Sequence, residues 1–449
     1  MKKHLIETAG LTAALAFSLV GCAGETDAQG ERAGADAAAG TSAEAATTAA
    51  AALDLSSQRL ADADISTQSS YEDSTDGGHA ITADGESTGY SNASVGKTGD
   101  SDGDEADFYG ENATVFATNG ATLDLSDLIA TTDGTHANGV FSYGDGTTVN
   151  VSHSIVRTAG NCSGGLMTTG GGTMNATDVT AETQGNSSAA IRSDRGGGDV
   201  NVTGGYYTTA GIGSPAIYST ADISVQGAYL QSSASQGVVV EGKNSVALTD
   251  CQLIASNTTK NSDKSDYYQA VMIYQSMSGD ADSGTSSFSM DGGTLTNENG
   301  DVFFVNNTLC RIDLTDAAIT NDDASGVFLR ASAAGWGTQG SNGGNVTLNA
   351  SSQAIDGDML VDDVSALNLY LQDGSSFSGT VNPSGQEGDV YVELDANSTW
   401  TLTGDSYVTS LTCVPGSIDL NGHALYVNGV AYDGESASAG EAIDMSAGA

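Results

Sequence analysis

The sequence predicts an all-β fold, a parallel β-helix, from a short pattern that returns along residues 121–350. Each copy reads apolar, any residue, apolar, a small polar residue, and then usually Asp or Gly. This alternation has period 2, which is typical of a strand and not of a helix. The copies begin at residues 123, 149, 174, 200, 223, 246, 288, 312 and 346, and most are 23 to 26 residues apart. A recurring period in the twenties is typical of a solenoid.

A second column of small or apolar pairs precedes most of these strands. The pairs are Val140-Phe141, Gly165-Leu166, Ala190-Ile191, Ala216-Ile217, Val238-Val239, Val271-Met272, Val302-Phe303 and Val327-Phe328. Two or more strands per repeat, with small polar residues between them, predict coils stacked about 4.8 Å apart. One coil cannot bury its apolar face, so the stack forms the core. The alternative, a β-sandwich, would give turn signals about every 8–12 residues without a repeated column.

The amino terminus has the pattern of a signal peptide. Lys2 and Lys3 precede an apolar run at residues 11–20, which is too short to span a bilayer. The run ends in Leu19-Val20-Gly21-Cys22, which resembles a bacterial lipobox. That resemblance implies lipidation of Cys22 and a lipid-anchored location on the extracellular face of the cell membrane. The alternative is a plain secretion signal followed by a chance cysteine.

We expect four regions: a signal peptide at 1–21, a low-complexity linker at 22–90, the β-helix at 91–430 and an acidic tail at 431–449. The first part of the linker is rich in Ala, Gly, Thr and Glu without a period. Two insertions interrupt the repeat, at 257–285 and 331–344, and the second contains Trp336. Insertions in solenoids form loops on one side, which is often the binding side.

The charge balance excludes one large class of partner. Lys and Arg number 13 against 57 Asp and Glu, so the net charge is −44. Nucleic-acid binding depends on cations, and so does electrostatic docking to anionic lipid. We therefore expect no nucleic-acid partner, and a membrane partner only through the N-terminal lipid.

A column of polar and aromatic residues follows the small-apolar pairs and contains several of the scarce cations. On successive coils it would form a strip about 34 Å long. Aromatic faces with Arg, Asp and Gln can hold a sugar polymer through stacking and paired hydrogen bonds. The alternative is that these groups only pair with one another on a solvated face. The ligand-binding candidates are Tyr143, Arg192, Asp194, Arg195, Tyr218, Glu241, Lys243, Tyr274, Gln275 and Arg330.

Catalytic patterns are weaker, and the sequence leans against an enzyme. Hydrolysis of a glycoside needs two carboxylates that face each other across one bond. The adjacent pairs at 322–323 and 362–363 point to opposite faces of a strand. A lyase could use Arg195 or Lys243 as its base, with Asp194 and Glu241 as Ca²⁺ ligands. No Ser-His-Asp arrangement or metal-spaced cluster is visible.

Calcium is the one cofactor that the sequence suggests. Asp100, Asp102, Asp104 and Glu111 match positions 1, 3, 5 and 12 of a calcium loop. Glu105 stands where the turning Gly belongs, and no flanking helix is evident, so a true EF-hand is not expected. Beyond Cys22, the cysteines are Cys162, Cys251, Cys310 and Cys413, without a CxxC spacing. We expect isolated buried thiols and no zinc site, and the sequence does not decide among disulfide pairings.

Several stretches together resemble one family. They are TNGATLDL (118–125), DGTHANGVFSYG (133–144), SAAIRSDRGGG (188–198), SPAIYSTADISV (214–225), VVVEGKNSV (238–246), IYQSMSGDAD (273–282) and SGVFLRA (325–331). Over residues 90–350 the chain resembles adhesin-like surface β-helix lipoproteins of anaerobic gut bacteria. The resemblance implies a right-handed, pectate-lyase-like β-helix, but no established activity. We expect a lipid-anchored surface protein for adhesion or glycan binding, whose partner is a carbohydrate or a host or bacterial surface protein. A polysaccharide lyase or glycoside hydrolase is the alternative, and a spacer without a ligand is a third interpretation.

Overall fold

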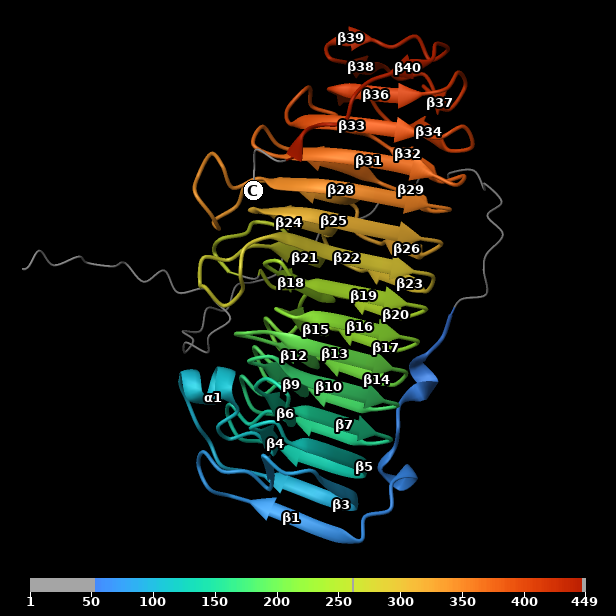
Figure 1. Cartoon of the computed structure of the whole chain (residues 1–449). Helices are drawn as coiled ribbons and strands as arrows, with labels where there is room; N and C mark the ends of the chain where they lie inside the picture. Colours follow the sequence, from blue (N-terminus) through green and yellow to red (C-terminus); the bar gives the residue numbers. More distant parts are fainter. Residues whose placement is uncertain (1–52, 261, 446–449) are drawn as a thin grey trace, which may run out of the picture.

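The computed structural model describes residues 53–260 and 262–445, which form a parallel β-helix (Figure 1). The expected signal peptide, the lipidation residue Cys22 and the first part of the linker lie outside the described residues. Successive coils stack along one axis, and most contribute one strand to each of three faces. The all-β solenoid predicted from the sequence is therefore confirmed.

The repeated pattern of the sequence forms the first face. Its strands pair in parallel and in register, so that Met174, Val200 and Ile223 lie directly above one another. The strands are β7 (Thr148–Ser152), β10 (Gly172–Thr177), β13 (Gly198–Thr203), β16 (Asp222–Gln226), β19 (Ser245–Thr249), β22 (Thr285–Asp291), β25 (Thr308–Thr315), β28 (Gly344–Ser351), β31 (Ala366–Gln372), β33 (Asp389–Leu394) and β36 (Ser410–Cys413).

In most coils two residues, the corner residue and the one after it, connect the first face to the second. Its strands are β8 (Ile155–Thr158), β11 (Thr180–Thr183), β14 (Tyr206–Thr209), β17 (Tyr229–Ser232), β20 (Gln252–Ala255), β23 (Thr294–Asn297), β26 (Ala318–Asn321), β29 (Ala354–Asp356), β32 (Ser376–Gly379), β34 (Thr399–Leu402) and β37 (Ile418–Asp419). The long strands β3 (Thr88–Lys97) and β5 (Thr122–Thr132) run through both faces. Below them, β1 (Ser69–Asp73) pairs with the second half of β3.

The column of small-apolar pairs forms the third face. Its strands are β2 (Ile81–Asp84), β4 (Val115–Thr118), β6 (Val140–Tyr143), β9 (Leu166–Thr169), β12 (Ile191–Ser193), β15 (Ile217–Ser219), β18 (Val238–Glu241), β21 (Gln269–Tyr274), β24 (Asp301–Asn306), β27 (Val327–Ala331) and β30 (Asp358–Val361). At the carboxyl end, β35 (Ser406–Val408), β38 (Leu425–Val427) and β39 (Val430–Ala431) form a small sheet, and β40 (Ser438–Ala439) pairs with β36.

The Asp-or-Gly position of the repeat is the corner between the first two faces. Asp127, Asp178 and Asp250 have φ values of 53°, 51° and 49° there, and Gly204 has 66°. This left-handed region is costly for most side chains, whereas Asp tolerates it and Gly adopts it freely. The backbone of the corner therefore explains the residue types that the sequence repeats.

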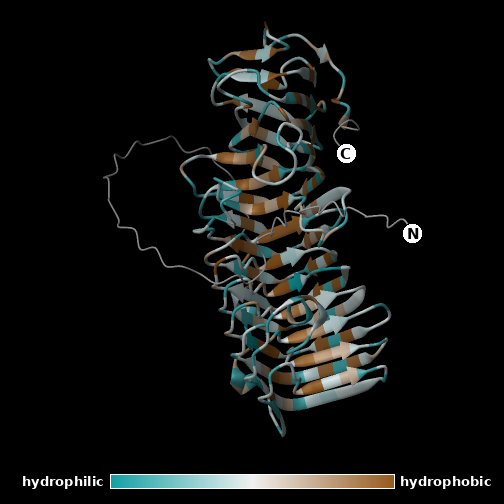
Figure 2. Ribbon diagram, turned by 90° about the vertical axis from the view of Figure 1, so that its left-hand side faces the viewer, coloured by the Kyte–Doolittle hydropathy of each residue, from teal (hydrophilic) through white to brown (hydrophobic). Residues whose placement is uncertain are grey.

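Apolar side chains fill the interior between the three faces. Figure 2 shows hydrophobic residues on strands that follow one another up the stack, while hydrophilic residues predominate on the loops. Phe288, Phe303 and Phe328 are fully buried, and the ring of Phe303 lies 5.6 Å and 5.5 Å from the other two ring centres. The core is thus continuous along the axis, as expected when each coil buries its neighbour's apolar surface.

Strands and packing contacts extend beyond the predicted bounds of the β-helix, residues 91–430, at both ends. Strand pairing begins at Ser69 in β1, well before residue 91, because the sequence of β1 is too polar to show the alternation of a core strand. At the other end, the predicted acidic tail continues to pack on the stack. The backbone N–H of Ile443 donates to Asn368 Oδ1, and β40 pairs antiparallel with β36.

Helices are few and short in the described residues. They are the 3₁₀ turns η1 (Ser56–Gln58) and η2 (Asp62–Asp64) and the six-residue α1 (Asp104–Tyr109). Within residues 53–260 and 262–445, no helix combines the length and apolar character that a membrane span requires.

Candidate functional site

Residues 53–65, which we call the strap, lie lengthwise over the outside of the second face (Figure 1). The Leu55 N–H donates to Gln252 Oε1 on β20 at 2.8 Å, and the Leu60 N–H donates to Thr180 Oγ1 on β11 at 2.8 Å. Between them, Gln58 donates to the Gly227 carbonyl at 2.8 Å. The strap therefore runs antiparallel to the progression of the coils, from β20 back to β11. This part of the predicted linker packs against the β-helix.

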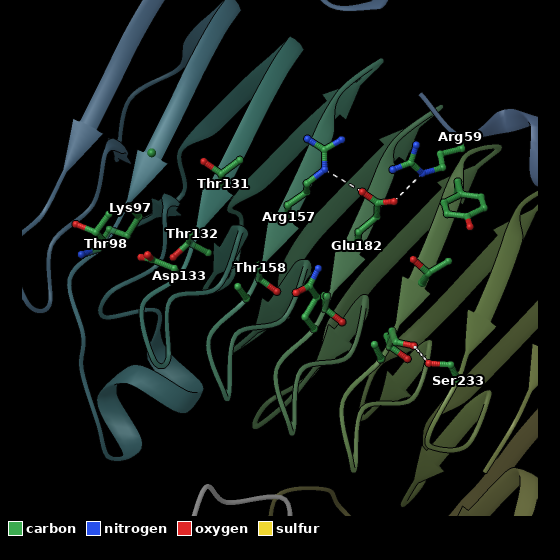
Figure 3. Close-up of a pocket in the computed structure, with 18 of the residues that line it drawn as sticks. Arg59, Lys97, Thr98, Thr131, Thr132, Asp133, Arg157, Thr158, Glu182 and Ser233 are labelled. Atoms are coloured by element: carbon green, nitrogen blue, oxygen red, sulfur yellow. Dashed lines mark hydrogen bonds and ion pairs between the residues drawn. The ribbon is translucent and has the colours of Figure 1, made fainter. Parts of the chain in front are cut away.

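A groove of about 800 Å³ lies beside the strap on the same face (Figure 3). Its floor contains a row of outward side chains, one from each successive coil. Because these strands pair in register, neighbours in the row are about 4.8 Å apart. The row consists of Thr131, Arg157, Glu182, Thr208 and Gln231.

Charged groups at the centre of the groove are paired with one another. Arg59 of the strap donates to Glu182 Oε1 at 2.7 Å, and Arg157 donates to Glu182 Oε2 at 2.9 Å. Arg157 also contacts Asp62 of the strap at 2.7 Å. One carboxylate thus holds two guanidinium groups, and Figure 3 shows both converging on it.

The pairing determines the protonation of Glu182. Partial burial acts to raise its pKa, but hydrogen bonds from Arg59 and Arg157 outweigh burial and lower the pKa below its usual value. Glu182 is therefore ionised at neutral pH. A general acid of a glycosidase requires the opposite shift, a carboxyl whose pKa is raised.

An aromatic platform lies at one end of the groove. Tyr206, which lines the groove, stacks on Tyr229 with ring centres 4.6 Å apart and planes 4° from parallel. Lys97 also lines the groove, but its ammonium group is buried and donates to the Thr75 carbonyl at 2.6 Å. The accessible chemistry of the groove is therefore that of guanidinium, carboxylate, hydroxyl and amide groups beside an aromatic ring.

The strip predicted from the sequence lies on the outer side of the third face. Segments inserted between strands cover it: α1 and residues 256–260, 262–268, 275–284 and 332–343. We call these segments the covering layer. Five of the predicted residues are buried beneath it, with exposed fractions of 1 to 4%. They are Arg192, Asp194, Tyr218, Glu241 and Tyr274.

Glu241 is the centre of one buried network in this layer. Its carboxylate accepts hydrogen bonds from the hydroxyl groups of Tyr218 at 2.5 Å, Tyr274 at 2.9 Å and Ser276. Burial raises the pKa of Glu241, and these hydrogen bonds oppose that change. Trp336 of the second insertion packs edge-on against Tyr274, with ring centres 5.2 Å apart.

Arg195 and Lys243, the two candidate lyase bases, lie at a smaller hollow of about 380 Å³. Both are ion-paired with the covering layer: Arg195 with Asp280 at 2.6 Å, and Lys243 with Asp282 at 2.8 Å. Burial acts to lower the pKa of Arg195, but the hydrogen bonds that Arg195 donates to Asp280 and Asp104 outweigh burial and raise the pKa. A guanidinium held in its charged form is a poor base.

The remaining strip residues are half-buried. Tyr143 packs against Tyr109 of α1, with ring centres 5.8 Å apart. Arg330 pairs with Asp301 at 2.6 Å, and its guanidinium lies 3.9 Å from the ring centre of Tyr267. Gln275 donates to the Ser276 carbonyl at 3.0 Å. The structure thus brings the strip residues onto one face but divides them among separate contacts.

The carboxylates of the suggested calcium loop are not gathered in the described part of the chain. Asp104 pairs with Arg195 at 2.8 Å, and Asp100 accepts from the Thr135 N–H at 2.7 Å. One other trio, Asp107, His136 and Cys162, has side-chain atoms within 4.8 Å of one another, but Cys162 is disulfide-bonded and offers no thiolate ligand. His136 Nδ1 and Asp107 Oδ1 already pair at 3.0 Å. The calcium site stays a prediction.

Three of the four cysteines agree with the expectation of isolated buried thiols, whereas the expectation is wrong for Cys162, which is disulfide-bonded. Cys251, Cys310 and Cys413 are free and buried. Burial raises the pKa of both Cys251 and Cys310, so neither is a reactive thiolate.

Burial of Asp194 predicts a pH-dependent stability. Its pKa is raised from 3.8 to about 6, first by burial and then by Asp280, while Arg192 opposes the shift. An acid that binds its proton more tightly when folded stabilises the fold below its unfolded pKa, and this contribution is lost as pH rises through the folded pKa. We expect the thermal midpoint to fall between pH 4 and pH 7. Asp194→Asn, followed by circular dichroism, should reduce that slope; an unchanged slope would contradict the assignment.

The sequence missed the groove. Arg157 and Glu182 follow the corner at equivalent positions of adjacent repeats. Because cations are scarce in this chain, Arg157 was a sequence signal that could have been used but was not. Arg59 lay in a segment that looked like linker. Comparisons with models of known protein families, with curated proteins and with solved structures find no match for this chain.

Proposed function

We propose that this chain is a lipid-anchored cell-surface protein that binds an extended glycan in the groove of the second face. The observation that carries the proposal is the open row of side chains that includes Arg157 and Glu182. A guanidinium held by carboxylates presents its remaining N–H groups in a defined direction, which suits recognition of sugar hydroxyl and carboxylate groups.

The shape of the groove favours a polymer over a compact ligand. The row from Thr131 to Gln231 crosses five coils, or about 19 Å at the spacing of a β-sheet. Each coil contributes a polar side chain from the same position of its strand. The aromatic ring of Tyr206 can stack against the apolar face of a sugar. A linear ligand lying along the axis meets all of these groups in turn.

The electrostatics favour binding over hydrolysis. The carboxylates that line the groove are those of Glu72, Asp133 and Glu182. Because the pKa of Glu182 is lowered, this central side chain is deprotonated at neutral pH. It can accept hydrogen bonds from a ligand but cannot serve as the proton donor that hydrolysis requires. The alternative enzyme would use the hollow at Arg195 and Lys243, where both cations are already paired with acids.

A polysaccharide screen with matched variants tests the groove. The mature chain is assayed against pectin, alginate, hyaluronan and mucin glycans, recording both binding and product release. Arg157→Gln and Tyr206→Ala are expected to weaken binding at least about tenfold, the order of 1.4 kcal/mol. Arg311→Gln is the control, since Arg311 is an exposed cation on the first face paired with Asp313.

The outcomes separate the interpretations. Equal binding by Arg157→Gln and the parent chain would remove the groove from the proposal. Released products that disappear with Arg195→Ala and Lys243→Ala would establish the enzyme instead. No binding and no product would leave the spacer or a protein ligand as the better account.

The anchor is tested separately from the groove. Lipidation at Cys22 predicts that the chain partitions with the membrane fraction and incorporates labelled fatty acid. Cys22→Ser is expected to abolish the label and release the chain, because attachment then lacks its acyl chains. Labelling that persists in this variant would rule out Cys22 as the lipidated residue.

A further inference from the structure

A notch lies where the third face turns into the first. The connection from β21 to β22 is the long loop 275–284, and that from β27 to β28 is the long loop 332–343. In the coil between them, a single residue, Asn307, connects β24 to β25. Because β22, β25 and β28 are neighbours in register, the short corner lies between two long loops. The space left above the short corner has a volume of about 500 Å³.

The floor of the notch is held by contacts from both loops. Asn307 has φ 53°, and its side-chain amide donates to the Gln275 carbonyl at 2.8 Å. On the other side, a Cβ at Gly337 would lie 2.2 Å from Asn307 Oδ1, so Gly337 permits the close approach of the second loop. Thr308 Oγ1 lies 3.0 Å from Ser286 Oγ. Hydrogen bonds and close packing therefore hold the residues of the floor in defined positions.

The lining of the notch is uncharged, although the chain has 70 charged residues (13 basic and 57 acidic). Hydroxyl and amide groups provide the polar part, and the exposed thioether of Met277 provides an apolar part. The nearby hollow at Arg195 differs, because Lys243, Asp280 and Asp282 also line it. The residues that define the notch are Gln275, Met277, Asn307, Thr308, Thr338 and Ser341.

We propose that this notch is a second binding site, which takes a neutral polyhydroxylated ligand of one or two sugar residues. Its volume lies within the usual range for small-molecule sites, about 300–1,000 Å³. Hydroxyl and amide groups match the hydroxyls of a neutral sugar, and the soft side chain of Met277 contacts its C–H face. The lining has no cationic side chain to bind an anion, and the net charge of −44 would repel one. The lining also has no carboxylate to bind a cation. The site is separate from the groove of the second face.

Saturation-transfer NMR on the full mature chain tests this site. The experiment uses the Arg157→Gln and Tyr206→Ala double variant, so that the groove does not contribute. The probes are methyl β-galactoside, methyl α-glucoside and N-acetylglucosamine, with glucuronate as the charged counterpart. Transfer to at least one neutral probe and none to glucuronate is the expected result. No transfer to any neutral probe, or equal transfer to glucuronate, overturns the proposal.

Two substitutions on the exposed walls locate the binding. Ser341→Trp fills the notch, and Met277→Ala removes the apolar contact; each should weaken binding of the neutral probe at least about tenfold. Ser325→Trp, on an exposed turn outside the notch, is the control and should leave binding unchanged. Unaltered thermal midpoints show that the fold is retained. Binding that survives both wall substitutions would place the sugar elsewhere and overturn the site.

Discussion

Replacing Arg192 with leucine is expected to lower the stability of the fold by about 3–5 kcal/mol. Arg192 is 1% exposed, and its guanidinium contacts Asp194 at 2.8 Å beneath the covering layer. Leucine fills part of the volume but leaves the Asp194 carboxylate buried without its cation. Removing one member of a buried ion pair costs more than the pair contributes, because the remaining charge is uncompensated.

Guanidinium titration followed by circular dichroism measures this effect. The double variant Arg192→Leu with Asp194→Asn should recover part of the loss, since it removes the stranded charge as well. Arg311→Leu serves as the exposed control, and its effect should stay within about 0.5 kcal/mol. A loss below about 1 kcal/mol for Arg192→Leu would show that water reaches Asp194 and that the covering layer opens readily.

Replacing Phe303 with alanine is expected to cost about 3–5 kcal/mol. The ring is fully buried and packs between Phe288 of β22 and Phe328 of β27. Truncation removes these contacts and leaves a cavity that the stacked coils cannot close, because their spacing is set by backbone hydrogen bonds. Phe303→Leu keeps most of the volume and should lose clearly less.

The position of the loss is as informative as its size. Contacts in a solenoid are made between neighbouring coils, so Phe303→Ala should increase amide hydrogen exchange first in β21, β24 and β27. Strands near the ends, such as β4 and β33, should keep their protection. Uniform loss of protection along the chain would mean that the stack unfolds as one cooperative unit instead.

Local physical chemistry made much of the fold predictable. Strand alternation and the corner residues depend on properties of a few adjacent residues. Asp178 and Gly204, for example, mark the end of a repeat in the sequence and adopt the left-handed corner conformation in the structure. The second face was harder to predict. Its strands, such as β8 and β11, are four residues long and follow the corner with one intervening residue, so they read as extensions of the first face.

The candidate sites were predictable only in part, because their composition depends on distant segments. The column containing Arg192 and Glu241 was visible, but its burial depends on residues such as Trp336 and Asp280 in later insertions. Likewise, Glu182 acquires Arg59 as a partner from 123 residues away. Sequence spacing carries no signal for contacts of that kind.

By itself, the sequence determined the repeating strand, the left-handed corner and the apolar ladders of this protein. These features follow from steric preferences and side-chain alternation, which act over a few residues. Only the tertiary structure decided which outer face remains open. The insertions cover the third face, whereas the strap crosses the second face and leaves a groove beside Arg157. Burial and ion pairing are set by which segments pack together in space, and that is why the open groove lies away from the column that the sequence emphasised.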